Sequence, residues 1–368
     1  MEYKKIIELT TVVTGGTPST EKREYWDNGS IPWLQSGCCQ NCEVNSAGKY
    51  ITQEGYDNSS TRMMPADTVM IALTGATAGK VGYLNFAACG NQSITGILPC
   101  GALNQRYLFY YLISQRHKIL ADCVGGAQAH ISQGYVKNIK VPVLSLVEQE
   151  QVVEVLTQLN NIISMRRKEI GLLDTLVKSR FAEMFGDVKY GTERWGGKLF
   201  KDITINLDSK RKPVKDADRK KMQGIYPYYG ATGIVDYVND YRQDGDFLLI
   251  SEDGKALELR SKPIAFLASG KIWVNNHAHV QQCTDECNMI YLMYHINFMD
   301  ISIWVTGIDQ KKLNRANLDI IPIALPPIEL QNQFADFVVS VDKSKSKIQK
   351  SLEETQLLFD SLMQKYFG

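Results

Sequence analysis

The sequence contains one long pattern twice, and this repetition limits the fold more than any other feature. The stretch GGAQAHISQGYVKNIKVPVLSLVEQEQVVEVL (125–156) resembles TGIDQKKLNRANLDIIPIALPPIELQNQFADFV (306–338) at an offset of about 182 residues. The aligned pairs are Gln128 with Gln310, Ile131 with Leu313, Ile139 with Ile321, Gln149 with Gln331, and Val152 with Phe334. The repetition predicts a tandem duplication of one structural unit.

Shorter matches precede these two stretches. GSIPWLQSG resembles GIYPYYGATG, DTVMIALTG resembles DFLLISEDG, and CGNQS resembles VNNHA. At 368 residues the chain is too long for one ordinary core. We therefore predict the fold class α+β, with a mixed α/β domain followed by a long helix, present twice. The predicted globular domains span 1–145 and 188–325, and the predicted helices span 146–187 and 326–368.

Both helical segments carry apolar residues at heptad spacing. The a and d positions of the first are Val152, Leu156, Leu159, Ile163, Arg166, Ile170, Leu173, Val177, Arg180 and Met184. Those of the second are Phe334, Val338, Val341, Lys345, Ile348, Leu352, Thr355, Phe359, Leu362 and Tyr366. Two matching narrow stripes predict an antiparallel two-stranded coiled coil, with the helices starting near residues 148 and 330 and the units related by a pseudo-twofold axis. Two separate amphipathic surface helices are the alternative.

The composition is that of an ordinary globular protein. Apolar residues make up 44% and charged residues 22%, and the net charge of +1 argues neither for nor against a nucleic-acid partner. No apolar stretch is long enough for a membrane span, and the sequence begins without a signal-peptide core. We therefore expect a cytoplasmic protein without membrane contact, whose eight irregularly spaced cysteines are reduced thiols.

The stretch ALTGATAGKVGYL (72–84) resembles a phosphate-binding loop at first sight. The nucleotide-binding form needs four residues between its glycines and a Ser or Thr after its lysine. Here only Ala76, Thr77 and Ala78 separate the glycines, and Val81 replaces the hydroxyl residue. The stretch therefore predicts a glycine-rich turn between the strands DTVMIAL and KVGYL.

In their order, and because they occur twice, these motifs resemble the DNA specificity domain of type I restriction–modification systems. The resemblance covers nearly the whole chain and depends on VVTGGTPSTEKREYWDNGSIPWLQSG, DTVMIALTGATAGKVGYL, GNQS and the repeated stretch above. Two places depart from the family pattern. VPVLSLVEQ lacks the double proline of ALPPIELQ, and the second unit has EDGKALELR where the first has TGATAGKVG.

The resemblance implies a specificity subunit with two target recognition domains, each of which reads one half of a bipartite site in double-stranded DNA. The helices would set the spacer between the half-sites and dock two methyltransferase (M) subunits, and restriction (R) subunits would complete the complex. S-adenosylmethionine would be bound by the M subunits, so we expect no cofactor and no catalytic residue in this chain. In this reading the turn from Gly75 to Lys80 is a structural element where the main chain approaches a neighbour, and Lys80 adds a phosphate contact.

The candidate DNA-contacting residues are polar side chains in the loops that the resemblance singles out, because base edges are read mainly by Arg, Lys, Asn and Gln and phosphates by Lys, Arg, hydroxyls and amides. In the first unit they are Thr17, Ser19, Lys22, Arg23, Gln35, Ser36, Lys80, Asn91 and Gln92. In the second unit they are Lys210, Arg211, Lys212, Tyr228, Tyr229, Lys255, Asn276 and His277. About half are expected to be solvated loop residues, and Trp33 is expected in the core.

Two other functional classes, a metal-dependent enzyme and a protein-binding adaptor, compete with DNA recognition. HAHVQQCTDEC and CCQNC contain possible zinc ligands, but the Cys-x-x-Cys spacing occurs only at Cys39 and Cys42. On a strand, His277 and His279 would point to opposite faces, so we predict no metal site. A two-lobed coiled-coil adaptor that binds only proteins is the main alternative to DNA recognition.

Overall fold

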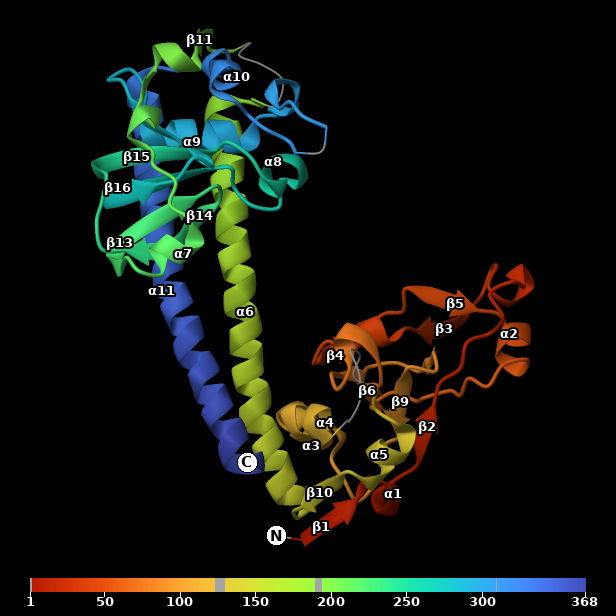
Figure 1. Ribbon diagram of the computed structural model, residues 1–368. Coiled ribbons are helices and arrows are strands. Elements are labelled where there is room, and N and C mark those ends of the chain that lie inside the picture. Colours follow the sequence, from red (N-terminus) through yellow and green to blue (C-terminus); the bar gives the residue numbers. More distant parts are fainter. Residues whose placement is uncertain (1, 123–129, 189–193, 309) are drawn as a thin grey trace. The chain divides into compact units, whose positions relative to one another are not determined.

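The computed structural model describes residues 2–122, 130–188, 194–308 and 310–368 (Figure 1). The chain forms two compact units, one made of Met1–Arg167 with Lys350–Gly368 and the other of Lys168–Gln349. Each unit combines one globular α+β part with a length of both long helices, α6 (Leu146–Phe185) and α11 (Ile328–Phe367). The predicted fold class and duplication are confirmed, whereas the pseudo-twofold axis and the domain boundaries stay predictions.

The first unit contains three small sheets. The described strands form a five-stranded sheet in the order β2-β9-β6-β7-β4, a three-stranded sheet β5-β3-β8 and the pair β1-β10. Their bounds are β1 Glu2–Lys5, β2 Val12–Thr14, β3 Ile31–Leu34, β4 Cys42–Val44, β5 Lys49–Ile51, β6 Val69–Ala72, β7 Val81–Leu84, β8 Cys89–Gly90, β9 Ile94–Ile97 and β10 Lys140–Val143. The shorter helices are α1 Ile6–Leu9, α2 Gln53–Asp57, α3 Gln105–Ser114, α4 Arg116–Asp122 and α5 Gln133–Asn138.

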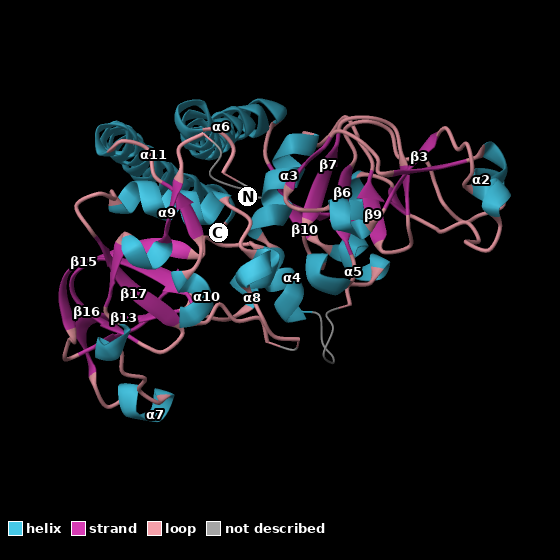
Figure 2. Ribbon diagram, turned by 90° about the horizontal axis from the view of Figure 1, so that it is seen from above, coloured by secondary structure: helices cyan, strands magenta, loops and turns pink. Residues whose placement is uncertain are grey.

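The second unit has one larger sheet. Its described strands form a six-stranded sheet in the order β12-β17-β15-β16-β13-β14 and the pair β11-β18. Their bounds are β11 Gly197–Leu199, β12 Thr204–Asn206, β13 Gln223–Gly230, β14 Gly233–Val238, β15 Gln243–Ser251, β16 Ala265–Val274, β17 Ala278–Cys283 and β18 Pro322–Ala324. The shorter helices are α7 Asp216–Arg219, α8 Lys255–Leu259, α9 Met289–Phe298 and α10 Arg315–Asp319. Figure 2 shows α9 between this sheet and the long helices.

The two long helices pair within each unit, as the heptads predict. In the first unit Ile163 and Phe359 belong to one core, and in the second Val177 and Phe334 do. Two polar seam positions, Arg166 and Thr355, pair across the helices: Arg166 Nη1 donates to the Thr355 hydroxyl and also to the Ser351 carbonyl, the latter at 2.6 Å. Since higher-numbered residues of α6 meet lower-numbered residues of α11, the packing is antiparallel, and the prediction of separate helices is excluded.

The start of α6 has a sequence reason. Ser145 and Glu148 form a capping box, in which the Ser145 amide donates to Glu148 at 2.9 Å and the Glu148 amide to the Ser145 hydroxyl at 3.3 Å. This pair satisfies two helix-end groups that would otherwise lack partners. The helix therefore begins at Leu146, two residues before the coiled-coil start near residue 148 that the heptad pattern predicts.

A buried glutamine joins each long helix to its globular part. Gln149 accepts a hydrogen bond from the Asn104 amide and donates to the Leu144 carbonyl, at 2.8 and 2.9 Å. Gln331 repeats this, accepting from Asn288 at 2.8 Å and donating to Pro326 at 2.8 Å. Both side chains are fully buried. The predicted pairing of Gln149 with Gln331 is thus confirmed, and we call this contact the glutamine clamp.

The remaining aligned pairs can be compared through main-chain contacts. The Ile131 amide donates to the Leu73 carbonyl and the Leu313 amide to the Glu252 carbonyl, both at 2.8 Å, which confirms the pairing of Ile131 with Leu313. The Ile139 amide donates to the Val136 carbonyl and the Ile321 amide to the Leu318 carbonyl, both at 3.2 Å, so each isoleucine closes the last turn of a short helix. Gln128, which aligns with Gln310, lies outside the described residues.

Candidate nucleic-acid interface

In the first unit, the predicted reading residues meet at one cavity. Thr17, Gln35, Asn91 and Gln92 all line a hollow of about 760 Å³ beside the three-stranded sheet β5-β3-β8. They come from the loop after β2, the end of β3 and the turn after β8. The structure therefore brings together four of the nine candidates of this unit.

Two glycines make this convergence sterically feasible. A Cβ atom on Gly15 would lie 2.1 Å from the carbonyl oxygens of Gly90 and Asn91, and one on Gly16 would lie 2.3 Å from the Ser60 hydroxyl. No side chain fits at such distances, so the loop after β2 needs glycine at position 15 to pass the β8 turn and at position 16 to pass Ser60 and Thr61. The motif TGGTP thus holds Thr17 at the cavity.

The turn after β8 in the first unit and the turn after β16 in the second unit are built the same way. The Asn91 side-chain oxygen accepts from the Ser93 amide at 3.2 Å, and that of Asn275 accepts from the His277 amide at 2.8 Å. Both turns follow a strand that pairs in parallel with its neighbour, β8 with β3 and β16 with β13. Asn91 therefore corresponds to Asn275, one residue earlier than the alignment of CGNQS with VNNHA implied.

The other candidates of the first unit lie at more varied places. Lys22 donates to the Tyr25 hydroxyl at 2.9 Å, and Lys80 donates to Gln40 at 2.7 Å. Ser19 and Arg23 are exposed, and Ser36 is half-buried at the end of β3. These side chains surround the loops without lining the cavity.

The glycine-rich turn is confirmed as a β6–β7 connection, and its glycines allow the tight turn that the sequence predicts. Gly75 and Gly79 adopt φ angles of 74° and 72°, which L side chains rarely adopt. A Cβ atom on Gly75 would meet nothing within 4 Å. Backbone conformation is therefore what requires glycine at position 75 inside this chain, and an approach of the main chain to a bound partner stays a prediction.

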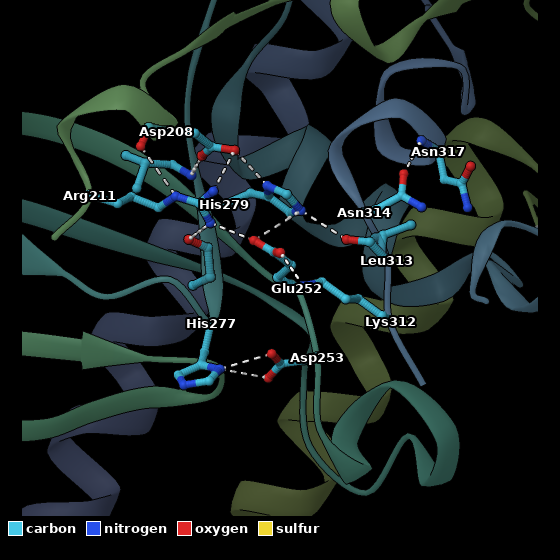
Figure 3. A network of polar contacts seen from close by, with 12 residues as sticks. Asp208, Arg211, Glu252, Asp253, His277, His279, Lys312, Leu313, Asn314 and Asn317 are labelled. Atoms are coloured by element: carbon cyan, nitrogen blue, oxygen red, sulfur yellow. Dashed lines mark hydrogen bonds and ion pairs between the residues drawn. The ribbon is translucent and has the colours of Figure 1, made fainter. Parts of the chain in front are cut away.

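In the second unit, a buried charged network lies beneath the predicted reading loops (Figure 3). Arg211 contacts Glu252 at 2.6 Å and Asp208 at 3.3 Å, and Lys312 contacts Glu252 at 3.0 Å. His279, whose side chain is 1% exposed, lies 2.6 Å from Asp208. Arg211 is thus held inward by carboxylates and is not free to reach a ligand.

Both ring nitrogens of His279 face acceptors. Nδ1 lies 2.6 Å from an oxygen of the Asp208 carboxylate, and Nε2 lies 2.9 Å from the Leu313 carbonyl oxygen. Burial disfavours the charged carboxylates, but hydrogen bonds from His279 to Asp208 and from Arg211 to Glu252 outweigh it and lower the pKa of both. The network therefore consists of compensated charges.

His277 points away from this network. Its Nδ1 lies 2.8 and 3.0 Å from the two oxygens of Asp253, and its side chain is 47% exposed (Figure 3). His277 and His279 thus contact different carboxylates; His277 lies in the turn before β17 and His279 on β17, so the alternation expected for two strand residues does not apply. The described part of the chain holds no group of three His, Cys, Asp or Glu side chains arranged for a metal ion.

The remaining candidates of the second unit divide by exposure. Lys210, Lys212, Lys255 and Asn276 are exposed. Tyr228 is 1% exposed and its hydroxyl accepts from the Val214 amide, so this tyrosine belongs to the core. Tyr229 is half-buried and stacks on Phe266 with ring centroids 6.1 Å apart. The structure leaves four lysine or amide side chains and His277 as accessible groups.

Sequence reasoning missed the acidic members of this network. Asp208, Glu252 and Asp253 orient Arg211, His279 and His277, and none was a candidate. The available signal was the acidic pair of Glu252 and Asp253 directly after the apolar run FLLIS.

The cysteines and the helices give two further results. The seven cysteines that the structure describes are free thiols, and Cys123 lies outside the described residues. The hydrogen bond with the Cys38 thiol, together with burial, raises the pKa of Cys39, which disfavours its thiolate. Within the described residues, we find no helix with the length and hydropathy needed to cross a membrane.

Comparison with known proteins assigns the family. The family profile described as "Type I restriction modification DNA specificity domain" matches residues 1–172 and 193–355. A putative type I restriction enzyme specificity subunit of Haemophilus influenzae is 38% identical over 132 residues, which cover 36% of this chain and 33% of that relative. The type I restriction enzyme MjaIX specificity subunit of Methanocaldococcus jannaschii is 23% identical over 400 residues, covering 99% of this chain and 92% of that protein.

A solved structure agrees in fold. The S subunit of the type I restriction–modification system from M. genitalium matches with a TM-score of 0.65 and 16% identity, covering 100% of this chain and 96% of that one. The matched profile spans both globular parts and most of both long helices. This chain therefore belongs to the type I restriction–modification DNA specificity family.

Proposed function

We propose that this chain is the specificity subunit of a type I restriction–modification complex and that each globular part reads one half of a bipartite site in double-stranded DNA. The observation that carries the proposal is a main-chain framework repeated in both units with different polar side chains exposed on it. A shared framework with different reading groups suits two different half-sites. An adaptor that binds only proteins has no comparable need for two differing polar loop sets.

The accessible side chains support base and phosphate contact. In the first unit, Gln35, Asn91 and Gln92 offer amides, which pair with base edges. In the second unit, Asn276 and His277 are accessible. Ser19, Arg23, Lys210, Lys212 and Lys255 are exposed and suit phosphates. We leave Arg211 and Tyr228 out of the proposed interface, because internal contacts already occupy them.

The long helices suit the role of a spacer. Each contains 40 residues, so it is about 60 Å long at 1.5 Å per residue. Half-sites one turn of DNA apart are separated by about 34 Å. Helices of this length can therefore hold two reading surfaces over separate half-sites.

We further propose that the helices dock two M subunits, which bind S-adenosylmethionine and methylate adenine, and that R subunits add cleavage. The first half of α6 supports this, because Val155, Ile162 and Met165 form an exposed apolar stripe outside the coiled-coil seam. Such a stripe suits contact with another protein. The chain alone should bind DNA weakly and methylate nothing.

Methylation-sensitive long-read sequencing of host DNA, with and without this chain, tests the proposal. The expected result is one bipartite adenine-methylated motif that disappears with the chain. Substituting Gln35 by Ala should relax one position of a single half-site, since a lost base contact costs about 1–3 kcal/mol of discrimination. Substituting Lys212 by Ala should weaken binding at all sequences and flatten its salt dependence. An unchanged methylome without the chain would contradict the proposal.

The spacer role has its own test. Seven residues inserted at Gly171 and seven in the facing segment 346–349 keep the heptad register and lengthen both helices by about 10 Å. Gly171 has open space around it, so the insertion should be tolerated. Both half-sites should persist with a spacer longer by about three base pairs. Altered half-sites with an unchanged spacer would exclude the helices as the ruler.

A further inference from the structure

The cavity of the first unit has an unusual lining for a surface that only follows a DNA groove. Three aromatic rings, those of Trp26, Trp33 and Tyr50, share it with the amides of Gln35, Asn91 and Gln92. Lys49 is the one cationic side chain in the lining, and no carboxylate lines it. Such a lining suits a flat, neutral group with a hydrogen-bonding edge better than it suits a phosphate.

Tyr50 carries the exposed ring of the cavity, whereas Trp33 is 3% exposed and belongs to the core, as expected from the sequence. Trp26 donates its indole N–H to the Ser19 carbonyl and Trp33 donates to the Gly16 carbonyl, both at 3.0 Å. The two indoles meet edge to face, with centroids 5.0 Å apart. Both N–H groups are therefore used inside the protein. Tyr50 is 45% exposed, so its ring offers a stacking surface at the cavity.

The amides, in contrast, keep groups free. The Asn91 oxygen accepts from Ser93 and the Gln92 oxygen accepts from Thr17, at 3.2 and 2.5 Å, so the NH₂ group of each remains to donate. In the described structure Gln35 uses neither its oxygen nor its NH₂ group. The cavity thus combines a stacking surface with at least two oriented donors, which complement the carbonyl oxygens of a base.

We propose that this cavity holds one nucleobase turned out of the duplex in the half-site that the first unit reads. The inference rests on the proposed function and adds a binding site to it. The cavity volume of about 760 Å³ leaves room for a base and its sugar at the mouth. The oriented NH₂ groups favour a base with a carbonyl oxygen, so this base is distinct from the adenine that the M subunits methylate. Stacking and edge contacts offset the cost of unstacking and unpairing.

The test uses the complete complex with M subunits and a set of duplexes. Each duplex carries one mismatch or abasic site opposite one position of the first unit's half-site. An extruded base is already unpaired in such a duplex, so binding should tighten on the order of tenfold at one position and not at the others. Tyr50→Ala and Gln35→Ala should each remove most of this gain. Both side chains are exposed, so these variants should fold.

Tyr3→Ala is the matched control, because Tyr3 is an exposed tyrosine of the same unit that does not line the cavity. It should keep the full gain. The inference is overturned if no position gains affinity, or if the gain survives in both cavity variants, while the wild-type complex still recognises its bipartite site. Loss of site-specific binding by the wild-type complex would instead count against the proposed function itself.

Discussion

The two units use one main-chain framework but fill the same central position in opposite ways. The β2–β9 register places Thr14 opposite Thr95, and in the second unit Asp208 and His279 correspond to them. Among the described residues, neither threonine hydroxyl has a hydrogen-bond partner. Asp208 and His279 instead contact each other at 2.6 Å, and these contacts continue to Arg211 and Glu252. Backbone contacts therefore set the framework, and the side chains inside it are an uncharged threonine pair in one unit and part of a charged network in the other.

The largest expected effect comes from removing one member of the charged network. His279→Leu takes away the donors to Asp208 and to the Leu313 carbonyl, leaving a buried carboxylate with less compensation. We expect a loss of about 3–5 kcal/mol in the second unit. Hydrogen exchange in increasing urea, followed separately for each unit, measures it.

The double variant Asp208→Thr with His279→Thr sharpens the comparison, because it installs the residue pair of the first unit. Its cost should be well below the sum of the two single costs, since the charge and its partner leave together. Additive costs would show that the framework does not accept the exchange.

Removal of the glutamine clamp should lower stability by about the same amount in both units. Gln149→Ala and Gln331→Ala each leave a main-chain N–H of a half-buried asparagine, that of Asn104 or Asn288, without its partner. We expect a loss of about 2–3 kcal/mol in the corresponding unit. Gln333→Ala, an exposed position on α11, is the control and should change stability little. A loss of stability in the other unit, and not in the unit of the substituted glutamine, would contradict this expectation.

Acid should destabilise the second unit before the first. A carboxylate whose pKa is lowered by folding stabilises the protein above its unfolded pKa of about 4, and this contribution is lost as the pH falls through the folded pKa. Asp208 and Glu252 have lowered pKa values, so the second unit should lose protection against hydrogen exchange first as the pH falls below about 4. The double variant Asp208→Thr with His279→Thr should reduce the difference in acid sensitivity between the two units. Equal acid sensitivity before and after that exchange would argue that other carboxylates dominate.

The smallest effect is expected in the first unit. Thr95→Val removes a buried hydroxyl without a partner and keeps the side-chain shape, so stability should stay unchanged or rise by up to about 1 kcal/mol. Urea unfolding of the variant measures this. A loss above about 1 kcal/mol would mean that the hydroxyl contributes a favourable contact.

The sequence predicted the features that depend on local patterns. The long helices follow from heptad spacing over many residues, and the glutamine clamp lies inside the long repeat. The charged network could not be predicted, because Asp208, Glu252, His279 and Lys312 come from distant segments whose proximity depends on strand order. Tyr228 and Tyr229 were both reading candidates, since alternation shows that one of them faces inward but not which one. The placement of the DNA-contacting residues stays a prediction.

The division of the chain into units affects the order in which it can fold during synthesis. The second unit is one continuous stretch, Lys168–Gln349, whereas the first needs Lys350–Gly368 to complete its core. Phe367 contacts Tyr107 with ring centroids 5.3 Å apart, and Phe359 contacts Tyr110 at 6.1 Å. Because the ribosome makes the N-terminal part first, the aromatic surface of α3 stays exposed until residues 350–368 have been synthesised after the second unit. A chaperone that binds apolar surface would therefore act mainly on the first unit, although its residues leave the ribosome earliest.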